Sequence, residues 1–364
     1  MKVLFTGGGT AGHINPALAA ASYLKKKNPD VDILYVGNRG GMEERIVPKA
    51  GYKFKSVKIS GFQRRLSLKN IGRNMATVVR IVTSSVEAKK IIKEFAPDVC
   101  VGTGGYVSGP VIREAAKMGI PCVVHESNAF PGVTIKMLSK KVHTVMIAVD
   151  AAKTHFDPSV NLKVTGNPIR PEIMMANKEL AKARLGLDER PVVLSVGGSL
   201  GAEKLNEAII PVIKNSIENK NYQHIHSTGY GKITKEHEEL ASSSIKMMEY
   251  VNMVQCLAAA DVVISRAGAI TVTEIAATEN ASILIPSPFV AENHQFHNAM
   301  TLVNLGAAEI IEEKNLNPQI LQEKIDSVLK TEGKSKIMGE KAKQIYVEDA
   351  NEQIYNIIIN AAKK

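Results

Sequence analysis

The chain has 364 residues, a formal net charge of +10, three cysteines and no tryptophan. This length predicts two domains of ordinary size. The absence of an apolar run of about 18 residues excludes a membrane-spanning helix, and a single early lysine followed directly by a strand excludes a signal peptide. Scattered cysteines without a CxxC pair indicate buried free thiols in a reducing compartment. With aromatic residues at only 5%, no nucleic-acid partner is expected.

The first predicted element is a short apolar strand, Val3–Thr6, that leads into Gly7-Gly8-Gly9-Thr10-Ala11-Gly12-His13. A helix is expected to open at Pro16. Glycines let a ligand lie against the backbone, and the N–H groups that begin the helix favour phosphate. His13 adds a titratable ring at the same place. This turn therefore predicts a site where negative charge and a proton transfer meet.

The same turn satisfies G-x-G-x-x-G, the pattern of dinucleotide oxidoreductases. Those enzymes need an acidic residue at the end of the second strand, but Asp32 lies at the beginning of the strand Val31–Val36. A P-loop needs G-K-[ST], and here His13 follows Gly12. The sequence therefore disfavours both a dinucleotide oxidoreductase and a P-loop nucleoside triphosphatase. A turn with a purely structural role remains the alternative to a ligand site.

Basic residues are concentrated in the first half of the chain. Residues 1–165 carry 25 Lys and Arg against 11 Asp and Glu, a net +14, and the remainder carries −4. In the densest stretch, 61–82, cations alternate with bulky apolar residues, which is typical of a surface that contacts anionic lipid. The expected membrane-contacting residues are Phe62, Arg64, Arg65, Leu66, Lys69 and Arg73. A solvated loop followed by a core helix is the open alternative.

Three more apolar strands run into turns of small residues and then helices. They are Asp98–Val101, Pro191–Val196 and Asp261–Ser265. Strands of this kind are buried on both faces and hence parallel, and parallel α/β sheets bind ligands at the carboxyl ends of their strands. Two prolines in 164–171 indicate a stiff linker. The predicted organisation is a first domain over 1–163, a linker over 164–170, a second domain over 171–345, and a final helix over 346–364 that packs back toward the first domain.

An ordered set of motifs covers almost the whole chain. It comprises Gly-Gly-Thr-Ala-Gly-His with Asn15-Pro16, Gly-Gly-Tyr-Val-Ser-Gly-Pro at 104–110, His-Glu-Ser-Asn at 125–128, Gly-Asn-Pro-Ile-Arg at 166–170, Gly-Gly-Ser-Leu-Gly-Ala at 197–202, the run 266–274, and Glu-Asn-His-Gln at 292–295. This set resembles the MurG family of bacterial glycosyltransferases. The resemblance implies the GT-B fold, an α/β architecture of two Rossmann-like domains whose parallel sheets face each other across a cleft.

The resemblance also implies an inverting, metal-independent hexosyl transfer without cofactors. N-acetylglucosamine moves from UDP-GlcNAc to lipid I, which gives lipid II for peptidoglycan synthesis at the cytoplasmic face of the cell membrane. Anionic phospholipid and other cell-wall synthesis and division proteins are the further partners implied. A diacylglycerol glycosyltransferase, a UDP-sugar epimerase and a non-catalytic nucleotide-sugar binding protein remain alternatives. The peptide variant of the acceptor and the oligomeric state stay open.

The resemblance assigns roles to residues of this chain. The implied donor contacts are Thr10, Ala11, Gly12, Asn128, Arg170, Ser199, Val251, Ala269, Ile270, Thr271, Glu274, His294 and Gln295. The implied acceptor contacts are Gly104, Gly105, Tyr106 and Ser108. The acceptor hydroxyl must lose a proton, and neutral histidine is suited to accept it near pH 7. His13 is the leading base, and Glu126, whose pKa burial would raise, is the second candidate. One departure from the family pattern is Leu200, where a glutamine is common.

Overall fold

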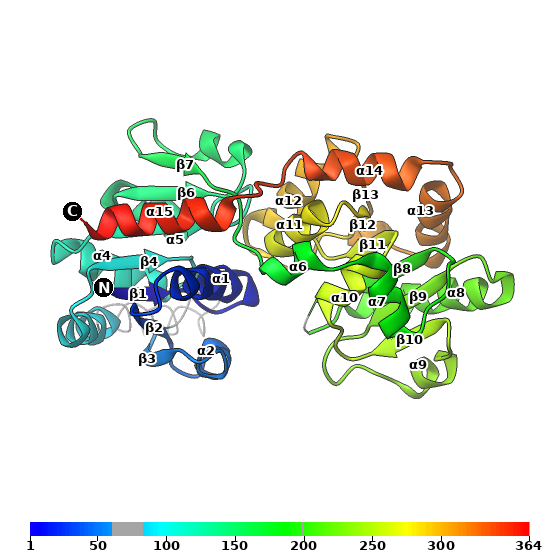
Figure 1. The fold of residues 1–364 in the computed structure, drawn as a ribbon, viewed down its shortest axis with the longest axis horizontal. Coiled ribbons are helices and arrows are strands. Elements are labelled where there is room, and N and C mark those ends of the chain that lie inside the picture. Colours follow the sequence, from blue (N-terminus) through cyan, green and yellow to red (C-terminus); the bar gives the residue numbers. More distant parts are fainter. Residues whose placement is uncertain (60–82, 199, 364) are drawn as a thin grey trace, which may run out of the picture. The chain divides into compact units, whose positions relative to one another are not determined.

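The computed structural model describes residues 1–59, 83–198 and 200–363. These divide into two compact units, Met1–Pro168 with Asp349–Lys364, and Ile169–Glu348 (Figure 1). The chain thus passes from the first unit to the second between Pro168 and Ile169, and returns for its last helix. We refer to these as the first and second units. No helix among the described residues is long and apolar enough to cross a membrane.

The first unit is built on a parallel sheet. Its described strands are β1 Lys2–Thr6, β2 Asp32–Asn38, β3 Lys53–Val57, β4 Val99–Gly102, β5 Cys122–Glu126, β6 Thr144–Ile147 and β7 Leu162–Val164. They lie in the order β3-β2-β1-β4-β5-β6-β7. Along the chain, β2 and β3 are added on one side of β1, and β4 to β7 are added on its other side. The loops that follow the neighbouring strands β1 and β4 therefore lie next to each other at the carboxyl edge of the sheet.

Helices cover both faces of this sheet. Those described in full are α1 Ala11–Lys27, α2 Glu43–Lys49, α4 Ser108–Lys117, α5 Val133–Leu138 and α15 Ala350–Ala362, with 3₁₀ turns η1 Ser139–Lys141 and η2 Asp150–His155. Alternate strand residues face opposite layers, so Val3 and Phe5 pack with α1 and α15, whereas Leu4 packs with α4 and α5. Figure 1 shows α15, in red, running along the sheet.

The last helix is tied to the first one by polar as well as apolar contacts. Tyr23 on α1 donates to the carboxylate of Glu352 on α15, and Lys27 lies 2.8 Å from the same carboxylate. Ile354 and Ile358 of α15 are buried in the same core cluster as Ile14 of α1. The C-terminal helix therefore completes the hydrophobic core of the first unit.

The second unit repeats the architecture. Its described strands are β8 Val192–Val196, β9 Gln223–Ser227, β10 Ile245–Met248, β11 Val262–Ser265, β12 Ala281–Leu284 and β13 Ala308–Ile310, in the parallel order β10-β9-β8-β11-β12-β13. Its helices are α6 Pro171–Met175, α7 Lys178–Leu185, α8 Glu203–Asn219, α9 Lys235–Leu240, α10 Met253–Ala259, α11 Ala269–Ala277, α12 His294–Val303, α13 Pro318–Leu329 and α14 Lys334–Lys343, with η3 Ala291–Asn293 and η4 Glu313–Asn315. The prediction of two parallel-sheet α/β domains is confirmed.

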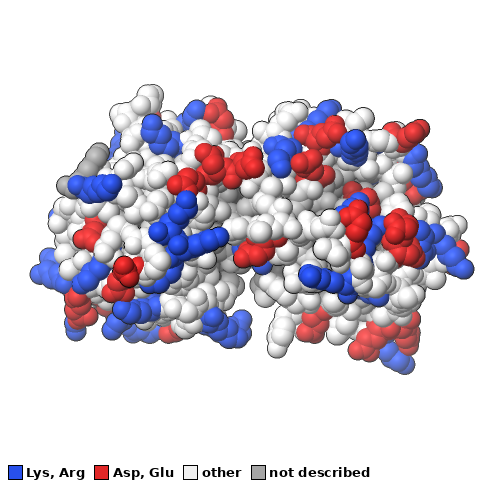
Figure 2. All heavy atoms as spheres, in the orientation of Figure 1, with Lys and Arg blue, Asp and Glu red and all other residues white. Residues whose placement is uncertain are grey.

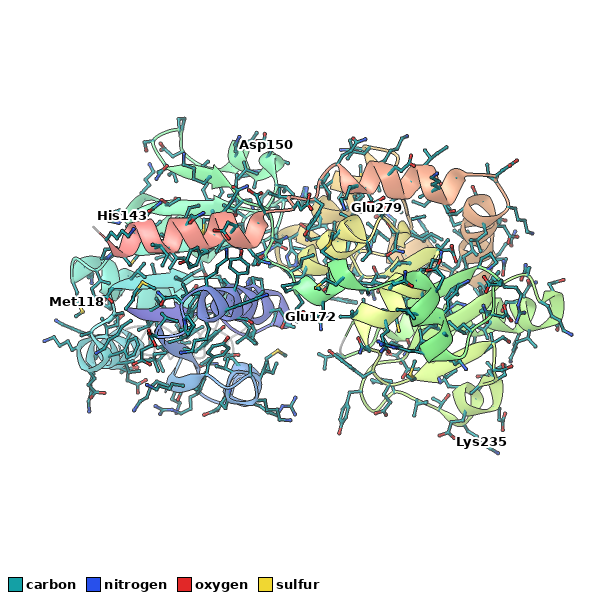
Figure 3. All side chains as sticks on the ribbon, viewed as in Figure 1. Met118, His143, Asp150, Glu172, Lys235 and Glu279 are labelled. Atoms are coloured by element: carbon teal, nitrogen blue, oxygen red, sulfur yellow. The ribbon has the colours of Figure 1, made fainter. Side chains whose placement is uncertain are left out.

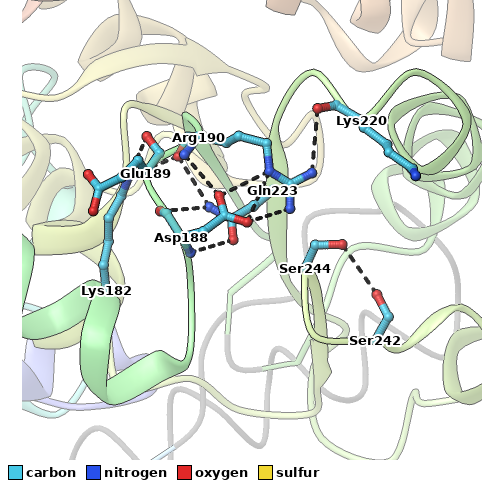
Figure 4. Close-up of polar contacts among 8 residues, drawn as sticks. All are labelled: Lys182, Asp188, Glu189, Arg190, Lys220, Gln223, Ser242 and Ser244. Carbon is cyan, nitrogen blue, oxygen red and sulfur yellow. Dashed lines mark hydrogen bonds and ion pairs between the residues drawn. The ribbon is translucent and has the colours of Figure 1, made fainter.

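A polar network closes the amino edge of the second sheet, where β8 and β9 begin (Figure 4). The guanidinium of Arg190 binds both oxygens of Asp188 and also donates to the carbonyl of Lys220. Gln223 accepts from the N–H of Asp188, and Lys182 donates to the carbonyls of Glu189 and Arg190. These bonds provide partners for backbone N–H and carbonyl groups at the amino edge of the sheet. The glycine turns lie at the opposite, carboxyl edge, where parallel α/β sheets bind ligands.

Two local expectations are corrected. The first helix begins at Ala11, not Pro16, so Pro16 lies inside α1 and His13 is on its first turn. Pro16 removes the bond that its N–H would have donated to the carbonyl of Gly12, and its ring crowds the same carbonyl. The second strand extends to Asn38 and begins at Asp32. As expected, Cys100, Cys122 and Cys256 are buried and free.

Candidate active site

His13 is held by the second glycine turn of the first unit. Its Nδ1 lies 3.1 Å from the carbonyl oxygen of Thr103, and the Thr103 hydroxyl donates to the carbonyl of His13 at 2.6 Å. A carbonyl can only accept, so Nδ1 carries the proton and the basic lone pair is on Nε2. The ring lies against Gly104, where a Cβ would stand 2.8 Å from Nδ1. The carbonyl of Thr103, after β4, thus holds the ring of His13 on α1 in the tautomer whose basic nitrogen is Nε2.

Glu126, at the end of β5, is buried and directs both carboxylate oxygens into its own loop. Oε1 accepts from the backbone and side-chain N–H groups of Asn128, each at 2.9 Å, and Oε2 accepts from the N–H of Gly132 at 2.8 Å. Burial raises the pKa of this carboxyl, while the same hydrogen bonds oppose the shift. The direction agrees with the expectation from sequence. The geometry favours a role in orienting Asn128, because these bonds occupy most of the lone pairs that a base would use.

The expected acceptor residues form a tight turn after β4. Gly104 and Gly105 have φ angles of 98° and 79°, a region that only glycine adopts freely. The N–H of Gly8 donates to the carbonyl of Gly104 at 3.3 Å, so the first and second glycine turns are joined through their backbones. Ser108 is buried and donates to the carbonyl of Gly105, which favours a role in shaping the turn. Tyr106 is 53% exposed and remains available to a ligand.

The donor residues of the first turn lie at the start of α1. Thr10 precedes the helix, and Ala11 and Gly12 begin it. The Thr10 side chain makes no capping bond, and the N–H of His13 donates to the Thr10 carbonyl, so the first turn of α1 has no side-chain cap at its N-terminus. This is the arrangement that favours an anionic ligand.

Glu274 lies on α11 in the second unit, with its side chain only 10% exposed. Arg170, from the segment before α6, approaches to 3.5 Å. Burial raises the pKa of Glu274, and the Arg170 charge opposes the rise. Ala269, Ile270 and Thr271 form the first turn of the same helix, which has no side-chain cap. The helix thus presents N–H donors for a diphosphate near its start and a carboxylate one turn further on.

Gln295 and His294 begin α12. The N–H of Ser287 donates to Oε1 of Gln295 at 2.8 Å, which orients the side-chain NH₂ as the group that can donate to a ligand. His294 Nδ1 lies 2.8 Å from the carbonyl of Ala291, and burial lowers the pKa of its ring. Glu292 and Asn293 have φ angles of 53° and 48°. Two successive left-handed residues that are not glycine mark a strained turn of the type found at ligand sites.

Of the remaining residues singled out from the sequence, some are described by the structure and others are not. Val251 is buried in the apolar layer beneath β8 and β11, so only its backbone can serve a ligand. Leu200 is strongly exposed. Ser199 and the expected membrane residues Phe62, Arg64, Arg65, Leu66, Lys69 and Arg73 lie outside the described residues.

No metal cluster emerges in the part of the chain that the structure describes: no group of three His, Cys, Asp or Glu side chains is placed to hold an ion. Asp30, Val31 and Asp32 lie where β2 begins, and so at the amino edge of its sheet, opposite the glycine turns.

Sequence reasoning missed two buried ionic groups. Glu43 on α2 packs beneath the first glycine turn, and Arg266 after β11 pairs with Glu313 and donates to the carbonyl of Ile285. Glu43 follows Gly40-Gly41 at the start of a short helix, and this was the available signal. Glu313 has no local signal, because its partner is 47 residues away.

Fold and site together define a two-domain glycosyltransferase that uses a nucleotide sugar. Residues 3–147 match the glycosyltransferase family 28 N-terminal domain, and residues 192–354 match the family's C-terminal domain. The chain belongs to this family and, within it, to the MurG transferases, so the resemblance inferred from the motifs is confirmed.

The relatives that support this cover the full chain. The chain is 45% identical over 368 residues to the UDP-N-acetylglucosamine--N-acetylmuramyl-(pentapeptide) pyrophosphoryl-undecaprenol N-acetylglucosamine transferase of Acetivibrio thermocellus, covering 100% of this chain and 99% of that protein. It is 41% identical to the protein of the same name from Bacillus cytotoxicus, with 100% of both chains covered. The crystal structure of Acinetobacter baumannii MurG superimposes with a TM-score of 0.77 at 26% identity over 99% of each chain.

The fold alone is shared more widely. A structure of S. aureus MnaA with UDP superimposes with a TM-score of 0.70 at 13% identity, and covers 100% of this chain and 98% of that one. The fold by itself therefore does not distinguish a transferase from other proteins with the same architecture. The residues of the site have to make that distinction.

Proposed function

We propose that this chain transfers N-acetylglucosamine from UDP-GlcNAc to lipid I, undecaprenyl-pyrophosphoryl-MurNAc-pentapeptide, and releases lipid II and UDP. The observation that carries the proposal is the 45% identity, over the entire chain, to a transferase named for this reaction. The geometry agrees with it, since a basic imidazole nitrogen lies at the carboxyl edge of the first sheet and a buried carboxylate with an arginine lies at that of the second.

His13 is the proposed general base. Its Nε2 takes the proton of the acceptor hydroxyl as the oxygen attacks the anomeric carbon, while Thr103 holds Nδ1–H and keeps the tautomer. A positioned base of this kind contributes roughly 10²–10⁴ to the rate. Glu126 is proposed to act on the sugar indirectly, because it fixes the side-chain amide of Asn128.

The leaving UDP is proposed to bind the second unit. As the bond to the sugar breaks, negative charge grows on the diphosphate, and the first turn of α11 supplies N–H donors aligned with the helix dipole. Arg170 adds a charged donor. Glu274 accepts from the ribose hydroxyls, and the Gln295 NH₂ donates to the sugar.

We further propose that the protein works at the cytoplasmic face of the membrane as a peripheral protein. The support is the basic and apolar stretch 61–82 together with the +14 charge of residues 1–165. Figure 2 shows Lys and Arg side chains spread over the drawn face of the first unit, with acidic side chains among them.

A turnover assay tests the proposed reaction. Purified protein is given UDP-GlcNAc with a lipid I analogue, with diacylglycerol, or with no acceptor, and released UDP is measured. We expect UDP release only with the lipid I analogue, and a product heavier by one N-acetylglucosamine. Release with diacylglycerol would identify a different glycosyltransferase, and conversion of UDP-GlcNAc without an acceptor would identify an epimerase.

A further inference from the structure

A carboxylate without any solvent exposure lies beneath the first glycine turn. Glu43, the first residue of α2, is 0% exposed. Its Oε2 accepts from the N–H of Gly9 at 3.2 Å, and its Oε1 accepts from the N–H of Asn38 at 2.8 Å. Among the described residues no ion pair neutralises it. A buried carboxyl group needs hydrogen-bond partners in place of water, and these two N–H groups supply them.

Three glycines make room for this carboxylate. A Cβ at Gly8 would stand 2.1 Å from Oε1, one at Gly41 would stand 2.7 Å from the carboxyl carbon, and one at Gly37 would stand 2.5 Å from Cγ of Glu43. These glycines come from the turn after β1, from β2 and from the loop before α2. Side chains at any of them would displace the Glu43 side chain. The close approach of all three segments shows that the first glycine turn is packed around Glu43.

The contacts continue from this turn to His13. The N–H of Gly8 donates to the carbonyl of Gly104, and a Cβ at Gly105 would stand 2.1 Å from the carbonyl oxygen of Gly8. Gly104 in turn lies against the imidazole of His13. A shift of the Gly8–Gly9 backbone therefore displaces the second turn and with it the surface on which the ring rests.

We propose that Glu43 is a positioning residue of the acceptor site, which fixes the first glycine turn and, through Gly104, the imidazole of His13. This inference rests on the proposed function. It also refines the expectation that the first turn holds phosphate, because the Gly9 N–H is already taken by Glu43. The acceptor pyrophosphate must then use other hydrogen-bond donors, namely those of the turn after β4.

The test compares Glu43→Gln with a matched control on the same helix. The carboxamide oxygen of glutamine can accept one of the two N–H groups but turns its NH₂ toward the other, so one bond is lost. Val47→Ala is the control, since Val47 is buried in the core on α2 and the change loosens the helix without touching the turn. Both variants are compared for melting temperature, for kcat and KM with the lipid I analogue, and for KM with UDP-GlcNAc.

We expect Glu43→Gln to lower kcat/KM for the lipid I analogue by roughly 10-fold to 100-fold, the usual worth of a hydrogen bond to a charged group, with the KM for UDP-GlcNAc within about 2-fold. Val47→Ala should lower the melting temperature while leaving both kinetic constants within about 2-fold. Equal losses of acceptor kinetics in the two variants, or unchanged acceptor kinetics in Glu43→Gln, would overturn the proposal.

A readout without turnover separates this proposal from the proposed function. In protein labelled with ¹⁵N-histidine, the His13 ring signals are identified by their loss in His13→Gln. We expect Glu43→Gln, but not Val47→Ala, to shift those signals. If the wild-type protein does not turn over lipid I, the proposed function is wrong. The comparison of the His13 signals in Glu43→Gln and Val47→Ala would still test whether Glu43 positions the ring. Unshifted signals in Glu43→Gln would refute the positioning role.

Discussion

The guanidinium of Arg170 lies 3.5 Å from the carboxylate of Glu274, and the two side chains differ in exposure, 54% against 10%. An ion pair with one solvated partner contributes little to stability, on the order of 0–1 kcal/mol. The buried carboxylate nevertheless pays a desolvation cost, seen in its raised pKa. A group kept ionisable at such a cost is more typical of a ligand site than of a structural pair.

Glu274→Ala should weaken donor binding. Bonds from the ribose hydroxyls to a carboxylate contribute about 1.5–3 kcal/mol each, so KM for UDP-GlcNAc should rise by at least roughly 10-fold, with a modest effect on kcat. Steady-state kinetics at saturating acceptor measure this. Glu172→Ala, at an exposed glutamate on α6 labelled in Figure 3, is the matched control and should change nothing. An unchanged donor KM in Glu274→Ala would remove this residue from the donor site.

His13→Ala should depress turnover and spare donor binding. Loss of a general base costs roughly 10²–10⁴ in kcat, and UDP-GlcNAc binding measured by calorimetry should stay near wild type. Glu126→Gln should be milder, because a carboxamide oxygen can still accept from Asn128. If Glu126→Gln lowers kcat strongly and His13→Ala lowers it only slightly, the two roles are the reverse of those proposed here.

Wild-type protein should float with vesicles rich in anionic lipid at low salt and largely dissociate at high salt. Each Lys or Arg near such a surface contributes about 1 kcal/mol, and the attraction fades beyond a Debye length. Replacement of Arg64, Arg65 and Lys69 by glutamate should abolish flotation and leave UDP-GlcNAc binding intact. Wild-type protein that ignores anionic vesicles at low salt would show that the basic stretch does not serve the membrane.

Stability of the second unit should fall in mild acid. Ser195 Oγ lies 2.8 Å from Nε2 of His224 and 2.7 Å from Nδ1 of His226, and both rings are fully buried. Burial lowers the pKa of His226 to about 3 and that of His224 well below its ordinary value. His237, whose ring stacks on that of His226, is also buried, and its pKa is lowered by burial.

The sign follows from which state binds protons. Below pH about 6.5 the unfolded chain protonates these rings while the folded unit does not, so the stability present above that pH is lost as the pH falls toward the folded pKa. Each ring contributes a slope of about 1.4 kcal/mol per pH unit. His226→Asn should make the pH dependence of urea unfolding between pH 7 and 5 shallower by about one proton. His143→Asn, at an exposed histidine labelled in Figure 3, should leave it as in wild type. Equal slopes in all three proteins would contradict this account.

Much of the fold could be predicted from local pattern. Apolar strands that lead into turns of small residues mark parallel α/β units, and β1, β4, β8 and β11 all occur where this pattern places them. The start of α1 could not be predicted well, because Pro16 is a local helix signal that the surrounding turns of helix override.

The candidate site shows a similar division. His13, Glu126 and Glu274 are visible as chemical groups in short motifs, and the family resemblance assigns them roles. The short motifs do not reveal the tautomer of His13 or the hydrogen-bond partners of Glu126. The tautomer depends on Thr103, which is 90 residues from His13, and the preference for a positioning Glu126 depends on the backbone of its own loop.

The amino-acid sequence already specifies the class of fold, the family, and the residue types that meet at the carboxyl edges of the two sheets. Strand periodicity, glycine turns and motif spacing are local properties, so they can be read along the chain. The burial of Glu43 against Gly8, Gly37 and Gly41 was decided by tertiary structure. So was the histidine pair around Ser195, whose two members lie on the neighbouring strand β9, 29 and 31 residues further along the chain. Close packing brings such distant groups within hydrogen-bonding distance and excludes water, and this determines which of them hold a charge, orient a base or resist protonation.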